Sequence, residues 1–184
     1  MKTLNLPIIL LLIFSCFKTA KSQIFSERGI RYGIGIESGL AVNYLAKKYD
    51  GIVGGSLQAD FPIIDNELFA TINSGYNNVF VKSDFEHLVD DMHIIPVKAG
   101  FKYFYKKNMY MQSEIGISFL LNKSNCVDGR NKALVIAPQV GIILLDSKHH
   151  QMDVGLRFES TGKFYKCDKQ SSFIGFRLAY AFVS

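Results

Sequence analysis

Residues 93–105 read HIIPVKAGFKYFY, and this stretch alternates apolar residues with polar or small ones. One set of alternate positions carries Ile95, Val97, Ala99, Phe101, Tyr103 and Tyr105, and the set between them includes Lys98, Gly100 and Lys102. Successive side chains of a β-strand point to opposite faces, so this pattern predicts a strand with one apolar and one polar face. The stretch is longer than the roughly 5–6 residues of a usual strand and long enough for the 9–11 of a transmembrane one.

The same alternation recurs along the rest of the chain. The further stretches are residues 31–42, 53–63, 68–76, 109–121, 133–145, 151–161 and 172–182. Residues 133–145 are the least regular, being apolar on both faces, and helical periodicity is weak throughout. Eight long alternating segments predict an all-β fold, an eight-stranded antiparallel up-and-down transmembrane β-barrel.

The connections between these segments alternate in length. Residues 43–52, 77–92, 122–132 and 162–171 form long connections, whereas residues 64–67, 106–108 and 146–150 form short ones. Outer-membrane barrels show this rhythm, with short periplasmic turns and long extracellular loops. The even number of strands then places both chain ends on the periplasmic side.

The N-terminus predicts export. Lys2 precedes the apolar run IILLLIF at residues 8–14, and small residues Ala20 and Ser22 stand at −3 and −1 of a cut before Gln23. We therefore predict a signal peptide at 1–22 and a barrel domain at 23–184; the alternative is a lipoprotein signal at Cys16.

The net charge of the chain is small once this segment is removed. The chain carries 21 Lys+Arg and 16 Asp+Glu. Removing 1–22 takes away three lysines and no acid, leaving 18 − 16 = +2. So small an excess gives no indication of nucleic-acid binding.

In a lipid-embedded barrel the apolar faces point outward and the polar faces line the interior. Ten charged residues fall on the polar parity: Arg31, Lys98, Lys102, Arg157, Arg177, Glu37, Asp60, Glu114, Asp153 and Glu159. The interior of an eight-stranded barrel is just wide enough for side chains to fill. Because an unpaired buried charge is costly, we expect the five cations and five anions to form a plug-like ionic network and not to line a wide pore.

Several stretches carry a resemblance to a known family. They are LQADFP at residues 57–62, IIPVKAGFKY at 94–103, EIG at 114–116 and GFRLAYAF at 175–182. With the signal peptide, they make the chain resemble the outer-membrane β-barrel family of Bacteroidetes known as PorT-like. The resemblance implies an integral protein of the cell outer membrane and no agreed activity.

These features together predict a barrel with a structural or surface-interaction role, no catalytic activity and no cofactor. Its partners are expected to be outer-membrane lipid and a surface or periplasmic protein. Two other functions stay open. In water the same alternation would give a soluble periplasmic or secreted lipocalin-like carrier with an apolar interior. A lipid-A-modifying enzyme would instead need a Ser–His pair on the outer wall, for which His93 with Ser118 or Ser74 is the candidate.

The predicted long loops hold two further candidate features. Cys126 and Cys167 fall in the third and fourth long loops, on the same side of the barrel, and export permits a disulfide between them. The second long loop and its flank hold Asp84, Glu86, His87, Asp90, Asp91 and His93. Their spacing matches no metal-binding loop motif, so we expect a solvated acidic loop and no metal site.

Overall fold

The computed structural model describes residues 29–64, 67–85, 91–122, 131–147, 149–162 and 171–183. The predicted signal peptide, Cys126 and Cys167 lie outside these residues. The strands are β1 (Arg31–Val42), β2 (Tyr49–Ile64), β3 (Leu68–Val81), β4 (Met92–Lys106), β5 (Met109–Leu120), β6 (Lys132–Asp146), β7 (His150–Thr161) and β8 (Ser171–Val183). Two short 3₁₀ turns, η1 (Leu45–Lys47) and η2 (Ser83–Phe85), follow β1 and β3. In the part described, no helix is long and apolar enough to span a bilayer.

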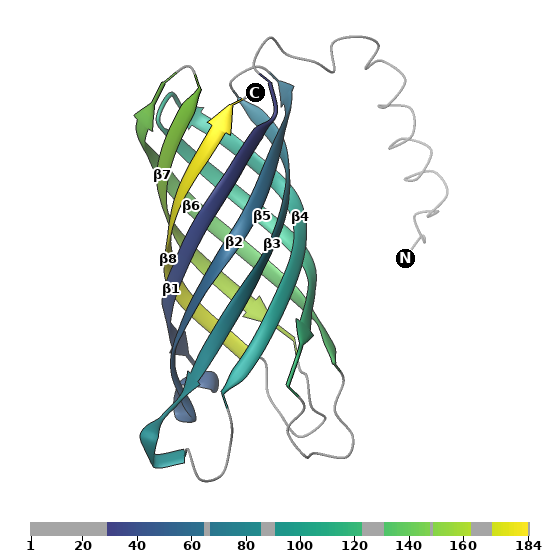
Figure 1. Ribbon diagram of the computed structural model, residues 1–184, viewed down its shortest axis with the longest axis vertical. Coiled ribbons are helices and arrows are strands. Elements are labelled where there is room, and N and C mark those ends of the chain that lie inside the picture. Colours follow the sequence, from purple (N-terminus) through teal and green to yellow (C-terminus); the bar gives the residue numbers. More distant parts are fainter. Residues whose placement is uncertain are drawn as a thin grey trace, which may run out of the picture.

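The eight strands close into one barrel in sequence order, each antiparallel to its neighbours, and β8 pairs with β1 (Figure 1). The predicted fold class is therefore confirmed. One passage round the barrel follows the cross-strand partners Tyr32, Ala59, Ile72, Ala99, Ile115, Ile136, Ser160, Ser172 and Val42. The passage returns to β1 at 42 − 32 = 10 residues from its start. Such a stagger accompanies the strand tilt that closes a barrel.

Two strands are longer than the sequence pattern predicts. β2 begins at Tyr49 instead of residue 53, and β3 runs on to Val81 instead of ending at residue 76. Glycines in β2 and the Asn77–Asn78 pair in β3 hide the alternation, yet Gly54 pairs with Asn77 in a continuing ladder. The first and second predicted long connections, 43–52 and 77–92, are therefore wrong in extent, because residues 49–52 belong to β2 and residues 77–81 to β3. The first connection begins at Asn43, which has a φ of 56°. Asparagine adopts this left-handed backbone conformation more readily than most residues do.

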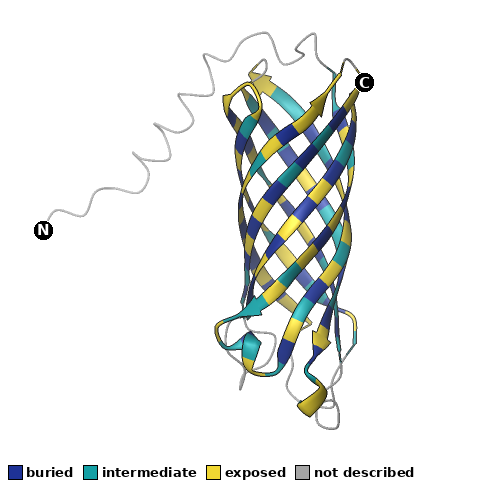
Figure 2. Cartoon of the chain, turned by 90° about the vertical axis from the view of Figure 1, so that its left-hand side faces the viewer, coloured by how far each residue is buried: buried dark blue, intermediate teal, exposed yellow. Residues whose placement is uncertain are grey.

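The polarity of the sheet is the reverse of that in a soluble barrel. Buried and exposed residues alternate along every strand (Figure 2). The exposed positions carry large apolar side chains, such as Leu40, Leu57 and Phe176, which are 65–70% exposed. The buried positions carry most of the charge. The outer wall is thus an apolar belt, as the predicted parity requires.

Apolar clusters lie at both ends of the interior. The loop-end cluster lies where the longer connections emerge and consists of Leu45, Tyr49, Ile52, Val79, Val81, Met92, Ile94, Leu120, Ala133 and Phe173. The turn-end cluster lies near the short turns and consists of Phe69, Phe104, Tyr110 and Ile143. Leu45 belongs to η1, so the first loop folds inward over the barrel mouth. The polar interior lies between these two apolar layers.

Candidate functional site

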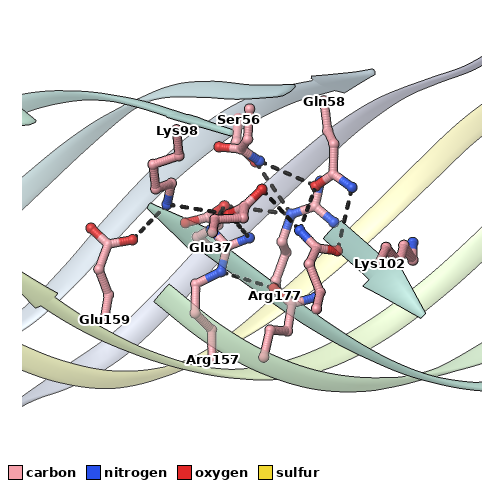
Figure 3. A network of polar contacts seen from close by, with 12 residues as sticks. Glu37, Ser56, Gln58, Lys98, Lys102, Arg157, Glu159 and Arg177 are labelled. Atoms are coloured by element: carbon pink, nitrogen blue, oxygen red, sulfur yellow. Dashed lines mark hydrogen bonds and ion pairs between the residues drawn. The ribbon is translucent and has the colours of Figure 1, made fainter. Parts of the chain in front are cut away.

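All ten charged residues that the sequence places inside the barrel are found there, and none is more than 8% exposed. They come from β1, β2, β4, β5, β7 and β8. Figure 3 shows many of them converging from facing walls. Long charged side chains can meet across the interior because a barrel of eight strands is narrow. We call these ten residues the ionic network.

Arg157 makes the contacts at the centre of the ionic network. Its Nη1 donates to Glu37 Oε1 at 2.9 Å, its Nη2 lies 3.4 Å from Glu114 Oε2, and its Nε donates to Gln139 at 2.8 Å. Arg177 shares the same acid, with its Nε 3.5 Å from Glu37 Oε1 (Figure 3). One arginine therefore links three strands besides its own, and the two guanidinium groups share one carboxylate.

The two lysines bridge further acids. Lys98 Nζ donates to Glu159 Oε2 at 2.6 Å and lies 3.9 Å from Glu114 Oε2. Lys102 Nζ lies between two aspartates, 3.5 Å from Asp60 Oδ2 and 3.7 Å from Asp153 Oδ2. Each lysine thus neutralises carboxylates from two different strands, as buried charges require.

Tyr110 joins the ionic network to the turn-end cluster. Its hydroxyl donates to Asp153 Oδ1 at 2.6 Å and accepts from Gln139 Nε2 at 2.7 Å, and its ring lies 4.1 Å from Lys102 Nζ. On β6, a Cβ on Gly141 would collide with this ring, so glycine is needed there. Sequence reasoning overlooked Tyr110, although its parity matches that of Gln112 and Glu114.

Neutral amides complete the interior. Gln58 donates to Asp60 at 2.6 Å, and Gln112 donates to Glu114 at 2.9 Å. Asn73 donates to Gln58 at 3.2 Å, so β3 joins β2 in the same hydrogen-bonded chain. These amides also lie on the inward parity and could have been found by it. They supply carboxylates with hydrogen bonds that cations alone leave unmade.

Arg31 occupies a different environment from the other four cations. Its guanidinium lies over the Phe69 ring, 4.1 Å from the centroid, and 5.4 Å from that of Phe104. Its Nη1 also donates to Gln151 at 3.1 Å. Arg31 therefore packs on the turn-end cluster, and sequence parity alone could not separate this cation–π position from the centre.

The candidate Ser–His pairs of the outer wall are not brought together. Ser118 is fully buried inside the barrel, so its predicted place beside His93 is wrong. Ser74 pairs with Val97, four residues along β4 from His93, or about 13 Å of strand. His93 Nδ1 is instead hydrogen-bonded to the Tyr76 hydroxyl at 2.7 Å.

The acidic second loop is described only in part. Glu86, His87 and Asp90 lie outside the described residues. Asp91 accepts the backbone N–H of Val81 at 2.9 Å, which makes it a structural acid at the root of the loop. In the ranges that the structure covers, no three His, Cys, Asp or Glu side chains gather as a metal site would require.

Comparison with known proteins concerns the fold. No protein-family model matches the chain, and no curated protein matches its sequence. Among solved structures, Neisserial surface protein A has a TM-score of 0.63 at 14% identity, over 84% of this chain and 96% of its own. The outer-membrane enzyme PagL has a TM-score of 0.61 at 11% identity, over 80% and 97%. The Yersinia pestis outer-membrane protein Ail in nanodiscs has a TM-score of 0.52 at 13% identity, over 86% of this chain and 100% of its own. The chain therefore has the fold of the small outer-membrane β-barrels.

Proposed function

We propose that this protein is an integral β-barrel of the cell outer membrane, closed to ions, with a structural or surface-interaction role. The observation that carries the proposal is the inverted polarity of the barrel. Large apolar side chains cover the outer wall, while ten charged side chains are buried inside. Soluble monomers rarely expose apolar patches beyond a few hundred Å², and this belt encircles the molecule.

The soluble carrier is the weaker alternative for a physical reason. A lipocalin-like carrier needs an apolar chamber for its ligand and a solvated outer wall. Here the interior holds ion pairs such as Lys98–Glu159, and the wall exposes Ile34 and Ile36. In lipid each face meets its preferred surroundings, because backbone groups are paired round a closed sheet and the wall matches the acyl chains.

The interior also supports a barrel without an open channel. Lys98 on β4 and Glu159 on β7 meet across it at 2.6 Å, and the loop-end and turn-end clusters lie at its two ends. An ion entering would have to displace apolar side chains and break buried ion pairs. A barrel without an open channel can still have a role as a membrane anchor, and its loops and turns can bind other molecules at the two membrane surfaces.

We further propose the partners that the sequence suggests: outer-membrane lipid and a surface or periplasmic protein, with no nucleic acid. The proposal assigns the chain no catalytic activity and no cofactor. It retains the cleaved signal peptide at 1–22, short turns on the periplasmic side and membership of the PorT-like Bacteroidetes family as predictions. The stretch IIPVKAGFKY at residues 94–103 is the main support for that membership.

Fractionation of expressing cells tests the proposal. We expect the mature protein in the outer-membrane fraction, soluble only with detergent, and migrating differently on a gel before and after boiling. Recovery from the periplasm without detergent would refute it. In planar bilayers the refolded barrel should give no stepwise currents, and regular single-channel steps would refute the closed interior.

A further inference from the structure

A groove of about 520 Å³ lies in the outer wall over β4 to β8. The residues that line it include Phe101, Met111, Val140, Phe158, Ser113 and Pro138. The groove is a partly open hollow in the wall, whereas a flat stretch of sheet offers an occupant contact on one side only. Its volume falls within the roughly 300–1,000 Å³ of ordinary ligand pockets.

The sequence explains why the wall is hollow here. Phe101, Ser113 and Pro138 are consecutive cross-strand partners on β4, β5 and β6, and Phe158 on β7 pairs with Ile174 on β8. Two short side chains thus lie between strands that carry phenylalanines. Neighbouring strands are about 4.8 Å apart. The short side chains of Ser113 and Pro138 therefore leave a hollow two strands wide between the two phenylalanines.

The backbone ladder is interrupted at the same place. Between β6 and β7, pairing runs through Ile136↔Ser160 and resumes at Gln139↔Arg157, omitting the two positions at residues 137–138. Proline has no N–H to donate, which accounts for an interruption at Pro138. The described ladder has one other mid-strand interruption of this kind, opposite Pro96 between β3 and β4. The groove therefore overlies a seam that backbone hydrogen bonds hold less firmly than its neighbours.

We propose that this groove is a binding site for one acyl chain of a membrane phospholipid. The inference rests on the proposed function, because it requires the belt to face lipid. The groove is continuous with that belt, so its occupant must come from the bilayer interior. The outward side chains that line it are apolar except for Ser113 and the Tyr103 hydroxyl. Gln112, Gln139 and Arg157 also border it, but these residues are buried on the inward parity. A flexible hydrocarbon chain fills such an irregular apolar site without leaving a polar group unpaired.

Native mass spectrometry of protein from vesicles tests the site. The full mature chain is refolded into palmitoyl-oleoyl-phosphatidylcholine vesicles, extracted into detergent and measured for retained lipid. Ser113→Leu places an apolar side chain in the groove. Ser38→Leu is the matched control, because Ser38 is an exposed outward serine on β1, away from the groove. A second filling variant, Val140→Phe, guards against a folding defect in the first.

We expect the wild type and Ser38→Leu to retain one phospholipid, and both filling variants to lose it. A roughly tenfold fall in the bound fraction would correspond to about 1.4 kcal/mol of binding free energy. Equal retention by all four proteins, no retention by the wild type, or graded loss of many lipids would overturn the site. A change in boiling-dependent migration on a gel reports insertion separately. Insertion without retention removes only the groove proposal, whereas failure to insert removes the proposed function.

Discussion

Replacing Arg157 by leucine should destabilise the barrel strongly. The side chain is 2% exposed and contacts Glu37 at 2.9 Å, Glu114 at 3.4 Å and Gln139 at 2.8 Å. In the variant Glu37 keeps Arg177 at 3.5 Å, whereas Glu114 keeps the Gln112 hydrogen bond at 2.9 Å and a more distant cation, Lys98, at 3.9 Å. Five interior anions then face four cations. Removing one partner of a buried pair costs about 3–5 kcal/mol, because the other charge stays buried.

Urea unfolding of the barrel refolded into vesicles measures this cost. With a slope of about 2 kcal/mol per M, the midpoint should fall by roughly 1.5–2.5 M. Lys107→Gln is the control, since Lys107 is exposed in the turn after β4, and its midpoint should stay close to wild type.

A double variant tests the pairing itself. Arg157→Leu combined with Glu37→Gln restores four cations and four anions, so its destabilisation should be smaller than the sum of the single effects. A midpoint for Arg157→Leu equal to that of wild type would refute the reasoning. Strict additivity would show that Arg157 and Glu37 are not coupled.

Three other predictions concern the wall and the loops. Gly100→Ala should block refolding, because the added Cβ would collide with the Ser113 carbonyl and lie 2.8 Å from Glu114 Cα. The control Gly33→Ala should refold, because a Cβ there meets its nearest neighbour at an ordinary 3.5 Å. Refolding yields are compared on a gel, and equal yields for the two variants would contradict this packing argument. Hydrogen exchange in detergent should be faster at the Pro96 and Pro138 seams than along the continuous β1–β8 ladder, and uniform protection would show that the interruptions do not loosen the wall. Cys126 and Cys167 should form a disulfide, because the Gly162 N–H donates to the Leu134 carbonyl and so joins the bases of the two loops that carry them. Mass spectrometry without reductant should then find the chain two hydrogens lighter than its free-thiol form. Two alkylatable thiols would exclude the disulfide.

The alternation of residues was sufficient to predict the strands, the closure and the inward charges. A period of two is a local property, so Lys98 and Lys102 could be assigned to the interior without any partner strand. Residues 49–52 were missed because glycine carries no side chain to show an alternation. The ends of β2 and β3 became strand through pairing, such as Gly54 with Asn77, which depends on two distant segments.

The partners inside the barrel could not be predicted in the same way. Whether Arg157 meets Glu37 or Glu159 depends on the stagger of ten residues and on side-chain length, neither of which is local. The burial of Ser118, by contrast, could have been predicted locally, because Ser118 has the same parity as Glu114. The groove at Ser113 and Pro138 arises from neighbours on three or more strands, and no single strand shows it.

The contact between Arg157 and Glu37 has a consequence for biogenesis. The two residues are 120 positions apart in the chain, and Glu37 stands directly opposite Arg177 where the first and last strands join. A partly inserted hairpin near the N-terminus would carry Glu37 into the bilayer long before either arginine arrives. Insertion of one hairpin after another is therefore unfavourable, because it would place an unpaired charge in the bilayer. The N-terminal strands should insert together with the C-terminal strands. The barrel should enter the membrane as a nearly complete ring, with the last seam formed as the charges neutralise each other.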